Sequence, residues 1–558
     1  HTTPTKNLPH VHSVPNSATR ILVALMEGQI DHTQTTAVLQ AIRSAQILDS
    51  GHFHGCIKWY AEDDGIHDSN AAFFTALSLV SMNGQYRAQL NRTECRILDE
   101  VLSDLHRWFM AAIGHQQCYY PNKYLGDLCC AWVIAEQAGK DADLPFIAGH
   151  LRTTGQFYHS DGWGWGEHMS TIYSTVCCDE LSLLLLTAKK LPDDIRTQYM
   201  ALLNELLSIF YAYDGGTFVP HIRSYAFGGS PTVENYRDRV LPWKTPSTVE
   251  LGNLPPLGPL FHAMGWHSLV APRAKRSEEH TVPCFGGSLA CASIREHVRF
   301  GAMTRYPIMK TADTPAWGLS WQSFPATLWH DSGDWGFWQW ETVENGSLRA
   351  HPANPLPVPY IPKALNDSTV PPLTGETHSI LQKGNALIVR IMPMMSVSWE
   401  RLTDRFRLIG THCTVLDGPQ APEAGWRQWL LRFPDAEVSI NFVTLAEIAS
   451  VEQTTHDGTT QGWRDYSPHG RVFHDWNITR DAALLSRQAA VCQGTWMGLW
   501  AVSLNGPVME KPILTPLPAT RTPQPLPAAG WRLHWTWPTQ TWNVDILPDM
   551  PEKLDVRA

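Results

Sequence analysis

Residues 161–173 read DGWGWGEHMSTIY, and this stretch lies between two segments whose apolar residues recur at three- and four-residue spacing. Such spacing predicts amphipathic helices, and the alternating Gly and Trp residues predict a loop between them. Helical spacing recurs along the chain, at residues 18–26, 71–80, 98–113, 128–137, 175–188 and 195–211. Residues 17–275 are therefore predicted to form successive antiparallel helical hairpins.

The connections between these helical segments carry clusters of aromatic and polar residues. Besides residues 161–168, they include residues 118–126 (CYYPNKYLG) and 214–216 (DGG). Repeated helix pairs whose loops gather at one end are typical of an (α/α) toroid. The sequence thus predicts a toroid over residues 1–275.

After residue 280 the pattern changes to short alternating runs that are rich in β-branched and aromatic residues. These runs, separated by Gly, Pro and Asp, lie at residues 297–300, 386–391, 405–409, 438–443, 472–474 and 496–503. Many strands without intervening helices predict an antiparallel β-sandwich over residues 285–558. Residues 271–279 are predicted to be the linker, and the Pro-rich segment 512–527 to be extended surface chain. The expected fold class is α+β and multidomain, an N-terminal (α/α) toroid followed by a C-terminal antiparallel β-sandwich.

Composition narrows the class of protein. Hydrophobic residues make up 43% of the 558 residues and charged residues 17%, which excludes intrinsic disorder. A formal charge of −10 argues against a protein that coats nucleic acid or anionic lipid by bulk electrostatics. No run approaches the roughly 20 apolar residues of a membrane span. We expect a soluble protein without a nucleic-acid or membrane partner.

Aromatic residues point to a substrate class. The chain has 24 Trp, 15 Tyr and 18 Phe, and several lie in Gly-rich stretches such as residues 163–166 and 336–340. Aromatic rings exposed on loops are suited to stacking on sugar rings. The alternative is that the Trp residues join two β-sheets in the core, and the sequence leaves both interpretations open.

Cysteine usage and sequons bear on the compartment. Eleven Cys, with adjacent pairs at 129–130 and 177–178 and no CxxC, indicate buried thiols rather than a disulfide framework or a zinc ribbon. Four N-x-S/T sequons lie at Asn91, Asn345, Asn366 and Asn477. The chain begins with His1 rather than Met. Together these features predict a secreted or periplasmic protein whose leader has been removed.

A toroid followed by a large antiparallel sandwich resembles the polysaccharide lyases and epimerases that act on uronic acids, of the heparinase II, chondroitin AC lyase and dermatan sulfate epimerase type. The resemblance covers nearly the whole chain as architecture but only a few residues as motif. Residues 161–173 resemble the Asp-Gly…His…Tyr helix entry that carries the catalytic His in those toroids, which implies His168.

The family's catalytic Tyr stands on a later loop, often beside an Arg, and here that loop corresponds to residues 221–225 (HIRSY). The resemblance thus implies Tyr225 and Arg223, with Tyr173 and Tyr236 competing for the Tyr role and Arg237 and Arg239 as substitutes for the Arg. Chondroitin AC lyases instead carry their Tyr two turns beyond the His on the same helix. Cys177 occupies that position here, which favours the long spacing.

The chemistry of β-elimination explains why these residue types are wanted. Removal of the weakly acidic C5 proton of a uronate requires neutralisation of the adjacent carboxylate, for which Arg223 has bidentate geometry and to which an Asn or a second His contributes. The Tyr225 phenol is suited to take the proton once a cation lowers its pKa, and to return a proton to the C4 oxygen. His168 serves either as the base or as a partner of the carboxylate or of Tyr225. The sequence does not choose between these two roles.

Further residues are predicted to contact the substrate. Those on the toroid loops are expected to line the cleft, and they are Tyr119, Tyr120, Asn122, Trp163, Trp165, Tyr173, Tyr236 and Arg237. From the sandwich, His330, His378 and His412 are weaker candidates. No His or Asp spacing specifies a zinc site, so no catalytic metal and no cofactor are expected.

Three other functions remain open at this point. A glycoside hydrolase on a similar toroid would need two facing carboxylates, which either Asp161 with Glu167 or Asp63 with Asp64 would supply. A C5 epimerase would use the same residues as a lyase, and a non-catalytic glycan-binding protein would use only the aromatic rings. Motifs for nucleotide binding, zincin proteolysis and α/β-hydrolase action are absent from the sequence.

Overall fold

The chain divides into two compact units in the computed structural model. Unit 1 comprises His1–His168, Ile172–Gly215 and Glu234–Ala274, and unit 2 comprises Met169–Thr171, Gly216–Val233 and Lys275–Ala558. The predicted domain boundaries stay a prediction, because residues 221–277 are not described. The described residues are 10–115, 118, 120–161, 163–164, 166–213, 217–220, 278–284, 288–309, 325–344, 347–351, 373–393, 399–421, 425–444, 451–457, 472–481, 495–507, 510–517, 530–537, 540–547 and 554–557.

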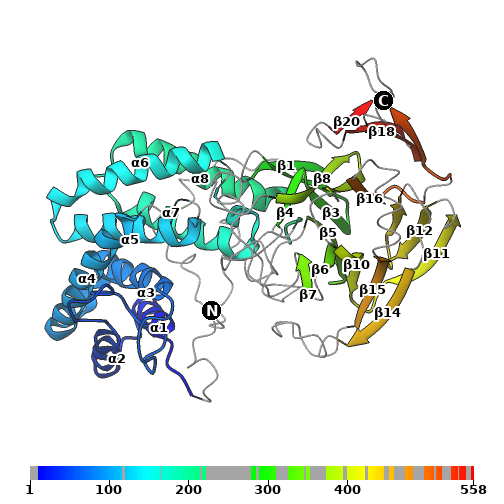
Figure 1. Cartoon of the computed structure of the whole chain (residues 1–558). Coiled ribbons are helices and arrows are strands. Elements are labelled where there is room, and N and C mark those ends of the chain that lie inside the picture. Colours follow the sequence, from blue (N-terminus) through cyan, green and yellow to red (C-terminus); the bar gives the residue numbers. More distant parts are fainter. Residues whose placement is uncertain are drawn as a thin grey trace. The chain divides into compact units, whose positions relative to one another are not determined.

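Unit 1 is built from helices (Figure 1). The predicted helical segments fall on the first, third, fourth, fifth, seventh and eighth of the described α-helices, and the structure adds the second and sixth. The described α-helices are α1 (Val14–Met26), α2 (His32–Ser44), α3 (Asn70–Ser81), α4 (Arg92–Ile113), α5 (Pro121–Gln137), α6 (Leu144–Asp161), α7 (Thr171–Thr187) and α8 (Asp193–Ala212). Short helical turns occupy Met82–Tyr86, Arg87–Gln89, Asp141–Asp143 and Glu167–Met169.

The helices form an inner and an outer layer, as the predicted toroid requires. Helix α3 packs against both α1 and α5, while α2 packs against α4 and α6 against α8. Residues around the whole circumference of α3 and α5 are buried, which is the pattern of inner helices. Helix α4 instead buries one stripe and begins with a capping box between Asn91 and Glu94, as expected of an outer helix. The described helices of unit 1 thus confirm the toroid class of fold.

The described strands of unit 2 form three sheets in which the paired strands are antiparallel. The nine-stranded sheet has the order β1-β2-β3-β5-β6-β10-β15-β14, with β7 paired to β6; the seven-stranded sheet has the order β11-β12-β13-β16-β9-β8-β4; the four-stranded sheet has the order β17-β18-β19-β20. In chain order the strands are β1 (Glu279–Pro283), β2 (Leu289–Ile294), β3 (Val298–Met303), β4 (Arg305–Met309), β5 (Ala326–His330), β6 (Trp335–Glu344), β7 (Ser347–His351), β8 (Leu373–Gln382), β9 (Asn385–Pro393), β10 (Trp399–Ile409), β11 (Thr414–Ala421), β12 (Trp426–Arg432), β13 (Glu437–Val443), β14 (Val451–Asp457), β15 (Val472–Asp481), β16 (Thr495–Ser503), β17 (Ile513–Leu517), β18 (Gly530–Trp537), β19 (Gln540–Ile546) and β20 (Asp555–Arg557).

The seven-stranded sheet is the middle layer of unit 2. On β9, Ala386 and Ile388 belong to the core shared with the nine-stranded sheet, while Leu387 and Val389 pack with the four-stranded sheet. Successive residues of a strand point to opposite faces, so a strand buried on both sides must be apolar throughout. The apolar run 386–389 of β9 therefore marks the middle of the predicted sandwich, to which the structure adds a third sheet.

Many Trp residues of unit 2 lie in these two cores rather than on loops. The buried Trp side chains of the cores are Trp338, Trp429, Trp476 and Trp500 between the two larger sheets, and Trp426, Trp535, Trp537 and Trp542 under the four-stranded sheet. These Trp residues therefore join β-sheets in the core, which was the alternative to sugar stacking in the interpretation of the sequence.

A buried ion pair joins the neighbouring strands β10 and β15 of the nine-stranded sheet. Arg480 Nη1 donates to Asp404 Oδ2 at 2.7 Å, each side chain is 2% exposed, and the guanidinium lies 5.2 Å from the Phe442 ring of the facing sheet. Removing one member of such a pair leaves a buried charge without compensation.

We therefore expect Asp404→Asn to lower the free energy of unfolding by about 3–5 kcal/mol in denaturant titrations. The exposed pair of Asp64 and His67 provides the matched control, because Asp64 is 88% exposed. Asp64→Asn is expected to leave the denaturant midpoint of unfolding nearly unchanged, because water screens an exposed ion pair. Equal effects of the two substitutions would contradict this account of the core.

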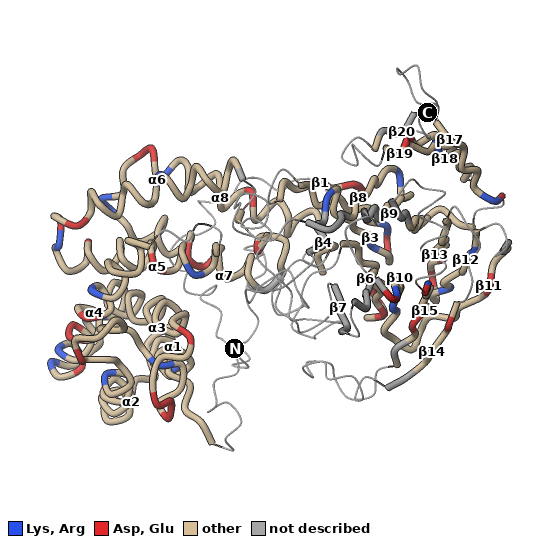
Figure 2. The backbone as a smooth tube through the Cα atoms, viewed as in Figure 1, with Lys and Arg blue, Asp and Glu red and all other residues tan. Residues whose placement is uncertain are grey.

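Three further features of the described residues concern membrane spans, surface charge and the sequons. None of the helices in the described ranges has both the length and the apolar character needed to cross a membrane. Lys and Arg are interleaved with Asp and Glu along the described elements of both units (Figure 2). Of the sequon residues, Asn91 caps α4 and Asn477 is 8% exposed and accepts from Arg405, so neither side chain is presented freely to a glycan.

Candidate active site

The inner helices of unit 1 begin at the same end of the toroid. Asn70, the first residue of α3, donates through Nδ2 to the hydroxyl of Tyr120 at 2.8 Å, just before α5 begins. Asn122, in the first turn of α5, contacts Glu167 in the turn that precedes α7. The starts of α3, α5 and α7 are thereby linked, and Tyr120 and Asn122 lie at the same end as the turn that carries His168.

The loop at residues 163–166 holds an unusual backbone. Trp163 has φ 61°, Gly164 φ 59° and Gly166 φ 87°, all in the left-handed region. Glycine adopts this region without cost, whereas Trp163 does not, and such strain is retained mainly at functional sites. The two glycines of the WGWG sequence are therefore required by the sharp turn that leads into Glu167 and His168.

Three rings stack behind this turn. The Trp163 ring lies parallel to the Tyr158 ring of α6, with the ring centroids 5.0 Å apart. The His168 ring stacks on Trp163 with a centroid distance of 6.0 Å and an interplanar angle of 18°. Trp163 Nε1 donates to Glu205 Oε1 of α8 at 3.2 Å. Burial raises the pKa of Glu205 above its ordinary range. Trp163 and His168 are both 0% exposed, so the stack fixes the plane of the imidazole inside unit 1.

Glu167 is held by two donors from Asn122. The backbone N–H of Asn122 donates to Oε2 at 2.7 Å and its Nδ2 donates to Oε1 at 2.6 Å, and both residues are 0% exposed. A carboxylate at the first turn of α5 also gains from the helix dipole. The backbone of the turn is fixed from the other side, because Ser174 Oγ of α7 donates to the His168 carbonyl oxygen at 2.5 Å.

A second set of ionisable groups lies deeper in the inner layer. Lys123 and Asp127 form a buried ion pair on α5, and the Lys123 ammonium lies 5.7 Å from the Trp108 ring. Glu180 of α7 is 0% exposed, and neither carboxyl oxygen has a hydrogen-bond partner. Burial, reinforced by the charge of Glu167, raises the pKa of Glu180 well above its ordinary range.

The predicted site residues fall into three groups. His168, Asn122, Trp163 and Tyr173 are buried in unit 1, and Tyr120 is partly exposed. Buried rings present no face to a sugar in the structure, so stacking by Trp163 and Tyr173 stays a prediction. Six of the predicted residues lie outside the described part of the chain: Tyr119, Trp165, Arg223, Tyr225, Tyr236 and Arg237.

The carboxylates of the hydrolase alternative do not form a facing pair in the described residues. Asp63 is 3% exposed and accepts the backbone N–H of Tyr60, whereas the neighbouring Asp64 side chain is 88% exposed beside His67. Glu167 is engaged by Asn122, as described above, and nothing is described of the Asp161 side chain. A hydrolase needs one protonated and one ionised carboxyl on either side of a bond. These positions lend that function no support.

The candidate histidines of the sandwich occupy separate places in unit 2. His330 is 2% exposed, contacts Asp435 Oδ1 through Nε2 at 2.6 Å and stacks on Phe433. His412 contacts Asp334 at 3.0 Å, and His378 is buried on β8. Within the described ranges, no three His, Cys, Asp or Glu side chains are grouped to hold a metal ion.

Cysteines line the inner layer as free thiols. Burial raises the pKa values of the paired thiols of α5 and α7 well above their ordinary range, and these residues are Cys129, Cys130, Cys177 and Cys178. The position at which chondroitin AC lyases carry a Tyr is therefore part of the core.

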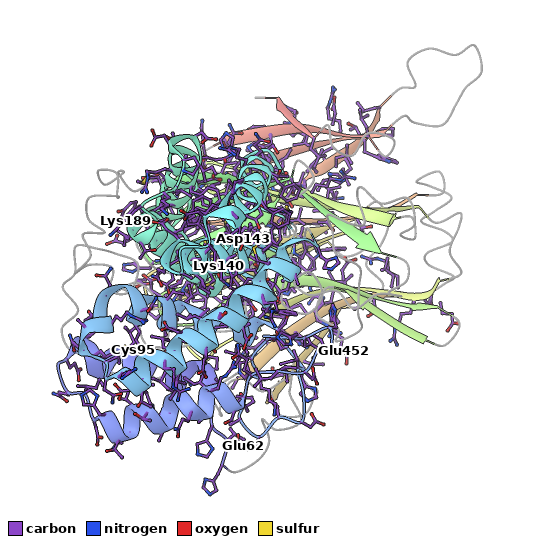
Figure 3. The ribbon with its side chains drawn as sticks, turned by 90° about the vertical axis from the view of Figure 1, so that its left-hand side faces the viewer. Glu62, Cys95, Lys140, Asp143, Lys189 and Glu452 are labelled. Atoms are coloured by element: carbon purple, nitrogen blue, oxygen red, sulfur yellow. The ribbon has the colours of Figure 1, made fainter. Side chains whose placement is uncertain are left out.

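These four thiols are expected to resist alkylation by iodoacetamide at pH 8 in the folded protein, because the thiolate is the reactive form. The partly exposed Cys95, near the start of α4 (Figure 3), is the control and is expected to react. Peptide mass spectrometry before and after unfolding measures both. Labelling of the four buried thiols as fast as Cys95 would contradict the packing of α5 against α7.

Comparison with known proteins bears on the fold. No protein-family model and no curated protein sequence matches this chain. Among solved structures, however, the crystal structure of heparinase III matches over 95% of this chain and 82% of its own, with 9% sequence identity and a TM-score of 0.50. The fold resembles that of heparinase III. At 9% identity, heparinase III informs the arrangement of helices and sheets but not the site residues.

Proposed function

We propose that the protein is a polysaccharide lyase that cleaves a uronic-acid-containing polysaccharide by β-elimination. The observation that carries this proposal is the likeness to heparinase III, a polysaccharide lyase, over 95% of the chain. The site at the loop end of unit 1 supports it further, because a His on a strained and well-anchored turn stands where the family resemblance expects one.

The roles follow from the chemistry and from burial. Arg223 pairs with the substrate carboxylate, and Tyr225 takes the C5 proton and returns a proton to the C4 oxygen. An imidazole without exposed surface is better suited to orient a neighbour than to meet the sugar, so His168 acts as the partner of Tyr225 or of the carboxylate. This choice between the two roles of His168 rests on its burial.

The remaining residues divide between support and contact. Asn122 and Trp163 hold the turn that carries His168, through Glu167 and through the ring stack. Tyr120, partly exposed and tied by Asn70, is the sugar contact at the start of α5, together with Tyr119, Trp165, Tyr236 and Arg237. A polymeric substrate fits the secreted or periplasmic location predicted from the sequence.

The proposal is tested by incubating the protein with polymers that contain glucuronate, iduronate, mannuronate or galacturonate. The ultraviolet absorbance of a 4,5-unsaturated uronate is followed together with new reducing ends. We expect both signals to rise in parallel on at least one polymer. Reducing ends without the absorbance would mean hydrolysis, and inverted C5 configuration without cleavage would mean epimerisation; either result overturns the lyase proposal.

A further inference from the structure

Glu180 is a buried acid that the proposed mechanism does not use. Its side chain is 0% exposed on the inner helix α7, and both carboxyl oxygens lack hydrogen-bond partners. Such a group costs free energy, and a native protein that retains one needs a reason for it.

The surrounding packing is built around this carboxyl group. A Cβ at Gly126 of α5 would lie 2.8 Å from Glu180 Oε1 and 2.6 Å from Phe73 of α3. Position 126 therefore admits no side chain, because Glu180 and Phe73 fill that space. The acid is enclosed by three inner helices rather than left in a loose gap.

The ionisable groups around Glu180 fix its charge. Among the groups with the largest electrostatic effect on Glu180, the cation is Lys123, which is already paired with Asp127. The other groups that face it are anionic or are neutral thiols: Glu167, Asp127, Asp179, Cys129, Cys130, Cys177 and Cys178. Two carboxylates in one dry interior do not both ionise. Two N–H donors from Asn122 favour the ionised form of Glu167, whereas Glu180 has no donor to stabilise a charge and burial favours its neutral form.

We propose that Glu180 is a positioning residue that stands behind the Asn122–Glu167 pair as a neutral carboxylic acid and thereby keeps the His168 turn in place. Loss of its proton at alkaline pH places a second negative charge beside Glu167, repels Glu167 from Asn122 and loosens the turn. This inference rests on the proposed function only for what the His168 turn does in catalysis.

The sign of the pH dependence follows from linkage. The pKa of Glu180 is raised in the folded chain, whereas in the unfolded chain it has the ordinary value near 4.5. Above that value the unfolded state releases a proton that the folded state retains, so rising pH favours unfolding until Glu180 ionises in the folded state too. The unfolding constant of the unaltered protein, relative to that of Glu180→Gln, is expected to rise about tenfold per pH unit over this window.

The test compares the unaltered protein with Glu180→Gln, which is neutral at every pH and nearly isosteric. Ser182→Ala is the matched control, because Ser182 is 1% exposed on the same helix and its Oγ also lacks a partner. Unfolding constants are measured by denaturant titration from pH 5 to pH 9. In parallel, hydrogen exchange of residues 166–174 is followed by mass spectrometry and corrected for the intrinsic pH dependence of exchange.

We expect the ratio of the unfolding constants of the unaltered protein and Glu180→Gln to rise about tenfold per pH unit. The corresponding ratio for Ser182→Ala is expected to stay constant with pH. The protection of residues 166–174 should fall at alkaline pH in the unaltered protein and persist in Glu180→Gln. Any loss of activity at alkaline pH should likewise occur in the unaltered protein and be absent from Glu180→Gln. A pH-independent ratio of unfolding constants would show that Glu180 is not neutral. Equal protection of residues 166–174 in both proteins would overturn the positioning role. Neither physical readout needs a substrate, so failure of the lyase proposal would leave this result readable.

Discussion

Tyr225→Phe is expected to lower the rate of β-elimination by about a hundredfold to ten-thousandfold, the range over which a positioned general acid–base group acts. The phenol is the group proposed both to accept the C5 proton and to return a proton to the C4 oxygen, and Phe keeps the ring while removing that proton path. The measurement is the initial rate of unsaturated-uronate formation on the best polymer of the panel. Unchanged thermal unfolding would show that the variant is folded.

Tyr173→Phe and Tyr236→Phe are the controls, because these residues compete for the same role. Tyr173 is 8% exposed in the first turns of α7, and its substitution is expected to leave most of the rate. Full activity of Tyr225→Phe together with loss of activity in Tyr236→Phe would move the base to residue 236. Loss in Tyr173→Phe alone would move it onto the helix that follows His168.

Asn122→Ala is expected to lower the free energy of unfolding by about 3 kcal/mol, because a hydrogen bond to a charged group is removed and a buried carboxylate loses a donor. The affected contact is the 2.6 Å hydrogen bond from Nδ2 to Glu167 Oε1. Since the same contact anchors the turn of His168, we also expect a loss of lyase activity that exceeds the loss of stability.

Asn70→Ala is the matched control for Asn122→Ala. Asn70 Nδ2 also donates one hydrogen bond, at 2.8 Å, but to the neutral hydroxyl of Tyr120 in a part-buried position. A neutral hydrogen bond of this kind contributes about 1 kcal/mol to stability. If both substitutions cost the same, Glu167 does not carry a buried charge, and the electrostatic account of the turn is wrong.

The sequence predicted the helices and strands correctly where the spacing of apolar residues was regular. The three- and four-residue spacing of apolar residues located α1, α3, α4, α5, α7 and α8, and the alternating runs located strands such as β9, β13 and β16. The third sheet was not foreseen, because its first strand, β17, contains Pro516 and lies in the Pro-rich segment 512–527, which was interpreted as extended surface chain. The likeness to heparinase III confirms the expected fold class.

The site was readable only in part. The glycines of the WGWG sequence predicted a loop before α7. The family resemblance separately implied His168, which follows that loop. Asn70, Glu180 and Glu205 were missed, because each acts through a contact between segments far apart in the sequence. Ser174 was also missed, because its contact is with the backbone of the preceding turn, which carries no side-chain pattern. The acidic pair at positions 179 and 180, which precedes the apolar run 183–186 of the same helical segment, was a signal that sequence reasoning left unused.

The most direct test of the lyase proposal is to run the reaction in heavy-oxygen water and to weigh the products. β-Elimination breaks the C4–oxygen bond without adding water. At reaction times short enough that the reducing end of a preformed oligosaccharide exchanges no oxygen with the heavy water, every cleavage product should therefore carry ordinary oxygen, and the products should sum to the mass of the substrate. Hydrolysis adds one water to each cleavage. Heavy oxygen incorporated at each new reducing end would contradict the account.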